Sequence, residues 1–290
     1  MSSPFSRELD ALPSLGLQLV RAAVARKPAR AAEVPRLELR VRHVVAEPPR
    51  LSRYRAVCGF EADGFLPASF PQVLAMPLHM ALLNRPEFPY RLLGLIHVRN
   101  VIRQFRRLPE GAPLAISCVL EGQREVRLGR ELDLSTRVES EGVLAWESVT
   151  TMLRRLPGAG EASRKARTAP EEDGRFRDSR PARWTVPADM GRRYAQASGD
   201  YNPIHLSTLS ARPFGFPRAI AHGMWTLSRC LAEMGEAGEV PSLTLTCEFR
   251  RPLFLGSQVQ FQTARQEGDV AFRVSSDEAT VHLVGALAPA

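Results

Sequence analysis

The sequence has few lysines, although its net charge is +8 and its pI is about 10. Lys27 and Lys165 are the only lysines, so arginine supplies nearly all of the positive charge. This bias is typical of a GC-rich bacterial genome. Zinc-finger spacing and basic runs interleaved with aromatic residues are also missing, so the sequence does not favour nucleic-acid binding. An acidic small ligand, such as a phosphorylated carrier, fits the basic balance equally well.

Cysteine pairs are missing as well. The four cysteines are Cys58, Cys118, Cys230 and Cys247. They are far apart and form no C-x-x-C pair, which argues against a structural zinc site and against a dense disulfide framework. We expect reduced thiols in a cytosolic compartment.

Long apolar runs are missing from the sequence too. The N-terminal segment carries Glu8 and Asp10 and lacks the continuous apolar region of a signal peptide. No stretch approaches the roughly 18 uninterrupted apolar residues of a membrane-spanning helix. The sequence therefore predicts a cytoplasmic protein.

Proline, glycine and charge gather in one internal segment, residues 157–181, which reads as a linker. It separates two parts of similar length, residues 37–156 and 182–290. Residues 1–36 form an N-terminal extension. Within it we expect a helix over residues 14–27, packed on its own protein rather than on a membrane surface.

The two parts look like repeats. The run Phe105-Arg106-Arg107 returns as Phe249-Arg250-Arg251 at an offset of 144 positions. In the second part a helix over 187–198 precedes a longer helix over 219–235, and period-two alternation then predicts four strands. The first part follows a similar plan, although Pro77 would kink its apolar helix. One apolar helix followed by antiparallel strands predicts an α+β fold with a sheet wrapped around a central helix.

The chemistry concentrates in residues 197–205, ASGDYNPIH. A tight turn there can hold Asp200 and His205 near one another, so that the two side chains share one water molecule. Gly199 permits the chain reversal and Pro203 stiffens the turn. Taken singly, each residue is more common as a turn cap or a polar core residue. Their joint occurrence instead predicts an acid–base site.

A second feature lies at the start of the longer helix, in the sequence AHGM. Backbone N–H groups at a helix start lack intrahelical partners, and the helix dipole adds a favourable potential for negative charge. The missing side chain of Gly223 would let a carbonyl oxygen approach these N–H groups. We therefore expect Gly223 to stabilise negative charge that develops on such an oxygen.

The stretch Ala197–Met224, with S-G-D-x-N-P-x-H followed by A-H-G-M, resembles the signature of MaoC-like dehydratases, which include type-2, R-specific enoyl-CoA hydratases. The resemblance implies a hotdog fold, doubled within one chain. It also implies reversible addition of water to trans-2-enoyl thioesters, giving R-3-hydroxyacyl products without a metal or redox cofactor. In the family, the residues matching Asp200 and His205 activate the water, and the backbone N–H matching Gly223 binds the carbonyl oxygen.

Further residues are candidates for contacts with the substrate. Ser198, Asn202 and His222 flank the acid–base pair, and Asn202 and His222 could instead only support the loop and the helix start. For the phosphates of CoA or of an acyl carrier protein, the candidate residues are Arg250 and Arg251, with Arg212 and Arg218 beside the loop.

The first part contains no copy of the motif. Under the offset of 144, Asp200, His205 and Gly223 fall on Ala56, Glu61 and His79. We expect one active site per chain, with the first repeat as a wall of the acyl tunnel and the protein as a monomer or homodimer. Two alternatives stay open: a non-catalytic acyl-CoA-binding or assembly subunit, and a thioesterase on the same fold.

Overall fold

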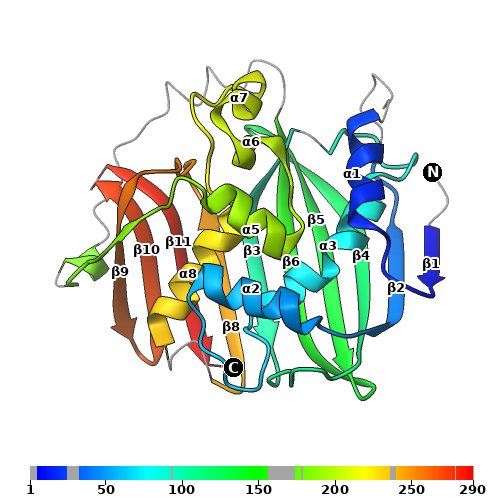
Figure 1. The fold of residues 1–290 in the computed structure, drawn as a ribbon, viewed down its shortest axis with the longest axis horizontal. Helices are drawn as coiled ribbons and strands as arrows, with labels where there is room; N and C mark the ends of the chain where they lie inside the picture. The colour runs from blue at the N-terminus through cyan, green and yellow to red at the C-terminus, as the bar shows by residue number, and fades with distance from the viewer. Residues whose placement is uncertain are drawn as a thin grey trace.

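The computed structural model describes residues 5–24, 33–92, 94–155, 174–177, 179–235, 240–277 and 279–289. One sheet of eleven strands runs through the molecule, and the helices lie on one of its faces (Figure 1). The strands are β1 (Phe5–Leu9), β2 (Leu37–Val44), β3 (Leu95–Gln104), β4 (Leu114–Val126), β5 (Gly129–Ser140), β6 (Val143–Arg155), β7 (Ala182–Thr185), β8 (Leu243–Phe249), β9 (Gln258–Gln266), β10 (Asp269–Asp277) and β11 (Thr280–Pro289). The helices are α1 (Leu15–Val24), α2 (Pro48–Cys58), α3 (Phe70–Leu83), α5 (Met190–Ser198), α6 (Pro203–Leu206), α7 (Thr208–Ala211) and α8 (Gly223–Met234), with short 3₁₀ turns η1 (Gly174–Phe176) and η2 (Arg212–Phe214).

The strand order shows that the sheet is doubled. From one edge to the other it reads β1-β2-β4-β5-β6-β3-β8-β11-β10-β9-β7. Apart from β1, the strand orders of the two halves mirror each other on either side of the β3–β8 pair. Outward from that pair, β3, β6, β5, β4 and β2 of the first half correspond to β8, β11, β10, β9 and β7 of the second. Each half carries a shorter helix and a buried central helix, α2 with α3 and α5 with α8. The predicted α+β fold and the predicted repetition are both confirmed.

The helices do not follow the uniform offset of 144. Helices α2 and α5 end at left-handed glycines, Gly59 (φ 88°) and Gly199 (φ 81°), which lie 140 positions apart. Helices α3 and α8 begin at Phe70 and Gly223, which lie 153 positions apart. The second half has a longer connection between its helices, and α6 and α7 form there. The alignment of Asp200 with Ala56 is therefore wrong, and the structural counterpart of Asp200 is Phe60.

The structure bears on further predictions about the N-terminal region, the apolar helix of the first half and the linker. Helix α1 lies inside the predicted range 14–27, and it packs on the protein, where the side-chain amide of Asn84 donates to the carbonyl of Gln18 (2.8 Å). The sequence missed β1, which pairs in parallel with β2. Helix α3 runs through Pro77. Most of the predicted linker lies outside the described residues, so the boundaries of the repeats stay a prediction.

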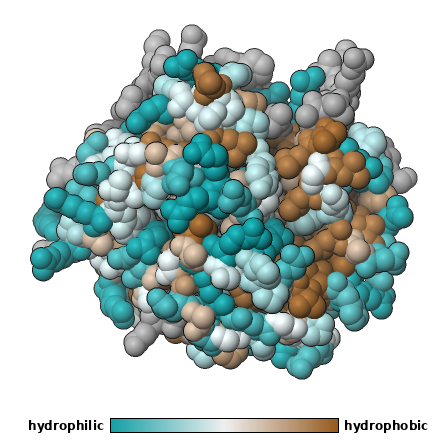
Figure 2. Space-filling view, viewed as in Figure 1, coloured by the Kyte–Doolittle hydropathy of each residue, from teal (hydrophilic) through white to brown (hydrophobic). Residues whose placement is uncertain are grey.

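The surface of α1 is partly apolar. Its Leu17 and Val20 side chains are 50% and 60% exposed. Figure 2 shows this apolar area on the right, over α1 and neighbouring elements, while the central area over α2 and α5 is hydrophilic. In the described part of the chain, no helix is long and apolar enough to cross a membrane.

A buried hydroxyl cluster joins the two halves. The Tyr54 hydroxyl on α2 lies 2.8 Å from Ser69 Oγ, beside the start of α3, and 2.7 Å from Ser228 Oγ on α8. Tyr54 and Ser228 are fully buried, so these hydrogen bonds fix the contact between α2 and α8 away from water. A buried hydroxyl group requires such partners, because leaving it unpaired is costly.

We expect Tyr54→Phe to lower the free energy of unfolding by about 2 kcal/mol, since two buried hydrogen bonds are lost. The two serines can still bond each other across their 3.0 Å separation, which limits the loss. Urea denaturation checks this against Tyr201→Phe, a control in which the side chain is 41% exposed. Equal unfolding midpoints for the two variants would contradict the assigned role of the cluster.

Candidate active site

The candidate site begins where α5 ends. Gly199 takes the left-handed conformation there, and its N–H bonds to the carbonyl of Ala195 (2.8 Å). The buried Ser198 hydroxyl donates to the carbonyl of Tyr194 (2.8 Å) and accepts the N–H of Asp200 (3.1 Å). These bonds fix the turn that carries Asp200. The contact of Ser198 with substrate stays a prediction.

Asp200 and Asn202 then organise the next turn. The Asp200 carboxylate accepts the N–H of Asn202 (3.1 Å), and the Asn202 side chain caps α6 by accepting the N–H of Ile204 (3.4 Å). Pro203 occupies the first position of α6, where its fixed φ suits a helix start. One turn of helix thus carries the chain from Asp200 to His205.

The orientation of His205 is set by one hydrogen bond. Its Nδ1 lies 2.9 Å from the carbonyl oxygen of Ile220, so Nδ1 carries the proton and donates it. The lone pair of the neutral ring is then on Nε2, which is the atom able to take a proton. The side chain is buried at 7% exposure.

His222 supports this arrangement from the start of α8. Its ring stacks on the ring of His205, with centroids 3.7 Å apart and planes inclined by 26°. Its Nε2 donates to the backbone carbonyl of Asp200 (2.9 Å). Its Nδ1 is buried and has no partner among the residues that the structure describes. His222 therefore ties the Asp200 loop to the helix that starts at Gly223.

Asp200, His205 and His222 form one compact cluster. A carboxylate oxygen of Asp200 and one ring nitrogen each of His205 and His222 all lie within 4.8 Å of one another. A water with two hydrogen bonds of about 2.8 Å can bridge atoms up to roughly 5.5 Å apart. A water shared by Asp200 and His205 stays a prediction. The structure brings together the two residues that the sequence selected for water activation.

Asp200 and the two histidines differ in their charge at neutral pH. Burial raises the pKa of the Asp200 carboxyl, but His222, His205 and the N–H of Asn202 outweigh it, and the net pKa lies below the usual value. Burial lowers the pKa of His205 more than Asp200 raises it. Burial also lowers the pKa of His222, to about 3. At neutral pH the site therefore holds one carboxylate and two neutral imidazoles.

The same three side chains could in principle hold a transition metal, since two imidazoles and a carboxylate form a common ligand set. The stacked rings argue against this. Lone pairs lie in the ring planes, and planes inclined by only 26° do not direct both nitrogens to one ion. A reaction without a metal stays a prediction.

Gly223 is the first residue of α8, and His222 provides no side-chain cap. The backbone N–H of Gly223 is one of the N–H groups at the helix start that have no acceptor within the helix. A Cβ at this position would lie 2.8 Å from Cε1 of Phe249, so only glycine lets the Phe249 ring rest against the helix start. Phe249 therefore forms the wall beside the proposed carbonyl site.

The arginines have different surroundings. Arg250 pairs with Glu248 (3.3 Å), both half exposed, and Arg218 stacks over Phe254 (5.0 Å). For Arg251 and Arg212 no ion pair is formed with the described residues. Phosphate binding by these arginines stays a prediction.

Sequence reasoning missed three residues that shape the site. Arg50 on α2 donates to the carbonyls of Ala197 (3.0 Å) and Ser198 (2.7 Å), so the first half holds the end of α5. Gly191 brings α5 against the carbonyl of His205, because a Cβ there would overlap that oxygen. Glycine inside a helix is a usable signal for such close packing. His97 on β3 packs edge to face on the Phe249 ring, with centroids 4.8 Å apart. Arg50 and His97 carried no comparable signal.

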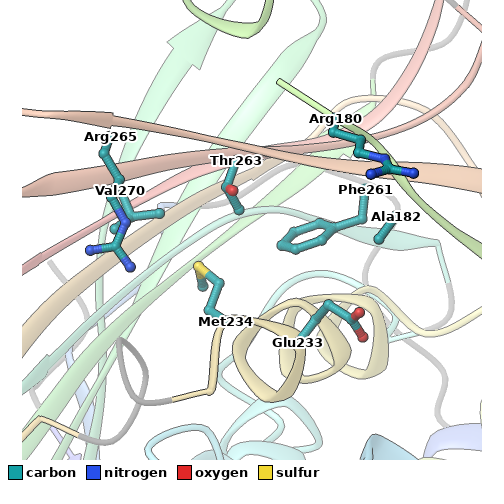
Figure 3. A pocket seen from close by; sticks show the side chains of 8 residues that line it. All are labelled: Arg180, Ala182, Glu233, Met234, Phe261, Thr263, Arg265 and Val270. Carbon is teal, nitrogen blue, oxygen red and sulfur yellow. The ribbon is translucent and has the colours of Figure 1, made fainter. Parts of the chain in front are cut away.

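A cavity of about 250 Å³ lies at the other end of α8 (Figure 3). Glu233 and Met234 of α8 border it on one side, and Phe261, Thr263 and Arg265 of β9 on the other. No residue of the acid–base site lines this cavity. It is therefore a separate feature of the second half.

Comparisons with known proteins point to one family. Residues 165–286 match the family model described as MaoC like domain. The 3-hydroxyacyl-thioester dehydratase X of Mycobacterium tuberculosis is 31% identical over 260 residues, covering 88% of this chain and 91% of the relative. The peroxisomal enoyl-CoA hydratase 2 of Arabidopsis thaliana is 30% identical over 155 residues, half of each chain.

Solved structures are similar in fold. The crystal structure of HtdX from M. tuberculosis superposes with a TM-score of 0.75 at 27% identity, covering 87% of this chain and all of that one. Another M. tuberculosis protein, described as a double hotdog fold, superposes with a TM-score of 0.54 at 11% identity, covering 92% and 97%. The second likeness concerns the fold alone.

The doubled sheet and these likenesses define a double hotdog protein. The chain belongs to the MaoC-like dehydratase family, and the relatives above are named a 3-hydroxyacyl-thioester dehydratase and an enoyl-CoA hydratase.

We expect Gly191→Ala to destabilise the protein by at least about 2 kcal/mol, because the added methyl group displaces the backbone at His205. Thermal unfolding measures the loss. The matched control is Gly174→Ala, where a Cβ meets nothing within 4 Å. A Gly191→Ala variant as stable as the control would show that the approach of α5 to His205 is not tight.

Proposed function

We propose that this protein is an R-specific enoyl-CoA hydratase, or 3-hydroxyacyl-thioester dehydratase, that adds water reversibly to trans-2-enoyl thioesters. The observation that carries the proposal is the cluster of the Asp200 carboxylate with His205, whose Nδ1 donates to Ile220 and thereby leaves Nε2 unprotonated. The lowered pKa values of Asp200 and His205 agree with an ionised carboxylate beside a neutral imidazole. Both side chains lie beside a helix start with free N–H groups, as conjugate addition to a thioester requires.

In the hydration direction, Asp200 and His205 hold one water between them. The water oxygen attacks C3 of the enoyl group while one water proton moves to Nε2 of His205. The electrons of the double bond shift to the thioester carbonyl oxygen, which the N–H of Gly223 stabilises. Asp200 stabilises the imidazolium that forms.

The imidazolium then returns its proton to C2 as the enolate collapses. The 3-hydroxyacyl thioester results, and His205 is neutral again. One residue serves as base and then as acid, so protons balance without a second acid. The thioesterase alternative would release free thiol, and the binding-subunit alternative would give no turnover. The presence of a complete acid–base pair in the second half supports the lyase over both.

We expect Asp200→Asn and His205→Gln each to lower kcat/KM for trans-2-octenoyl-CoA by at least 10²-fold, the lower end for positioned acid–base groups. Loss of the conjugated absorbance follows the reaction, and chiral analysis of the product checks the R configuration. Asp269→Asn and His43→Gln, both at exposed positions, are the matched controls. Wild-type rates in Asp200→Asn would reject the assigned roles.

The pH profile gives a separate check. Only neutral His205 can accept the water proton, so kcat/KM should fall as pH drops through the pKa of His205, which burial places below 6.5. The Asp200 carboxylate raises the pKa of His205. Asp200→Asn removes that charge, so the acid limb of the residual activity should move to lower pH. A limb that moves to higher pH would contradict the coupling.

A further inference from the structure

The N-terminal extension is built onto the first half of the molecule. Strand β1 lies at the edge of the sheet beside β2, with Phe5 opposite Leu37. Helix α1 follows it. The side-chain amide of Asn84, the residue after α3, donates to the backbone oxygen (2.8 Å) and to the side-chain oxygen (3.1 Å) of Gln18. Gln18 is only 3% exposed. The position of α1 is therefore set by the first half of the sheet and by α3.

The first residue of α1 reaches the second half. Leu15 lies three positions before Gln18, on the same face of the helix. Its side chain packs against the backbone of Gly199, because a Cβ at Gly199 would overlap Cδ1 of Leu15. Gly199 is the residue directly before Asp200, and it ends α5 in the left-handed conformation (φ 81°). A leucine of the N-terminal extension thus contacts the turn that carries the candidate base.

Arg50 on α2 contacts the same turn from the first half. Besides its hydrogen bonds to the last carbonyls of α5, its Nη2 lies 3.4 Å from the position that a Cβ of Gly199 would take. Leu15 and Arg50 therefore pack on one side of Gly199. Neither residue belongs to the half that carries the acid–base cluster.

Gly199 needs such packing more than another residue would. Glycine has the widest freedom in its backbone angles, and it has no side chain of its own to hold it in place. The side chain of Leu15 fills the space beside it and restricts the turn. A misplacement of about 1 Å in a reacting group can cost roughly 10² in rate. Packing at Gly199 therefore bears directly on where Asp200 lies relative to His205.

We propose that Leu15 is a positioning residue for Asp200, which makes the N-terminal extension a part of the framework of the active site. The inference rests on the proposed function, because it assigns Leu15 a role in the reaction that Asp200 and His205 perform. Leu15 acts through the backbone of Gly199 and not through contact with the substrate. Its loss should therefore lower kcat and leave KM nearly unchanged.

The test truncates Leu15 in the full chain. In Leu15→Ala the turn can shift into the vacated space, so we expect kcat for hydration of trans-2-octenoyl-CoA to fall at least about fivefold, with KM changed by less than about twofold. Leu17→Ala is the matched control, since it removes the same side chain from the outer face of α1, where Leu17 is 50% exposed. We expect wild-type kcat in Leu17→Ala and in Leu15→Met, which refills the space.

Amide hydrogen exchange provides a readout that does not depend on activity. The N–H groups of Gly199 and Asp200 bond to Ala195 and to the Ser198 hydroxyl, so in Leu15→Ala they should exchange faster than in the wild type. The amides of β8 should keep their wild-type rates. Thermal unfolding verifies that each variant is folded at the assay temperature. If Leu15→Ala does not fold, the smaller truncation Leu15→Val decides by the same criteria.

Equal kcat values for Leu15→Ala and Leu17→Ala would overturn the inference, and so would unchanged amide exchange at Gly199 and Asp200. A raised KM at wild-type kcat would also overturn it, because Leu15 would then act in substrate binding. The proposed function would survive each of these results. A wild-type protein without hydratase activity would instead contradict the proposed function, and the inference would fall with it.

Discussion

The hydrogen bond from His205 Nδ1 to the carbonyl of Ile220 is the interaction on which the site depends. It fixes the tautomer that leaves Nε2 able to accept a proton, and it ties the Asp200 loop to the segment leading into α8. His222 repeats the connection in the other direction, from the start of α8 to the carbonyl of Asp200. Water-activating groups and helix-start N–H groups are thereby held in one rigid assembly, as acid–base catalysis requires.

The two halves of the sheet share the structure and divide the chemistry. The second half has the long connection between its helices that holds Asp200, α6 and α7, and the first half passes directly from Gly59 toward α3. The first half nevertheless contributes to the site. Arg50 caps the end of α5, and a bulge in β3 turns His97 toward Phe249.

Much of this was predictable from local sequence. Period-two alternation located the four strands after residue 240, and the Gly199 and Pro203 signals placed Asp200 and His205 in one turn. The uniform repeat offset failed because helices cannot be aligned across a connection of different length. His97 and Arg50 act through tertiary contacts formed across the junction of the halves, and no local pattern encodes such contacts. Bulges are equally hidden, because the register of a pair depends on both strands.

The most direct test of the central claim is a high-resolution crystal structure with octanoyl-CoA, a saturated thioester that cannot be hydrated. The account predicts the thioester carbonyl oxygen about 3 Å from the backbone nitrogen of Gly223. It also predicts one water bonded to both an Asp200 oxygen and His205 Nε2. A carbonyl bound away from α8, or His205 with Nε2 donating to a protein acceptor, would contradict it.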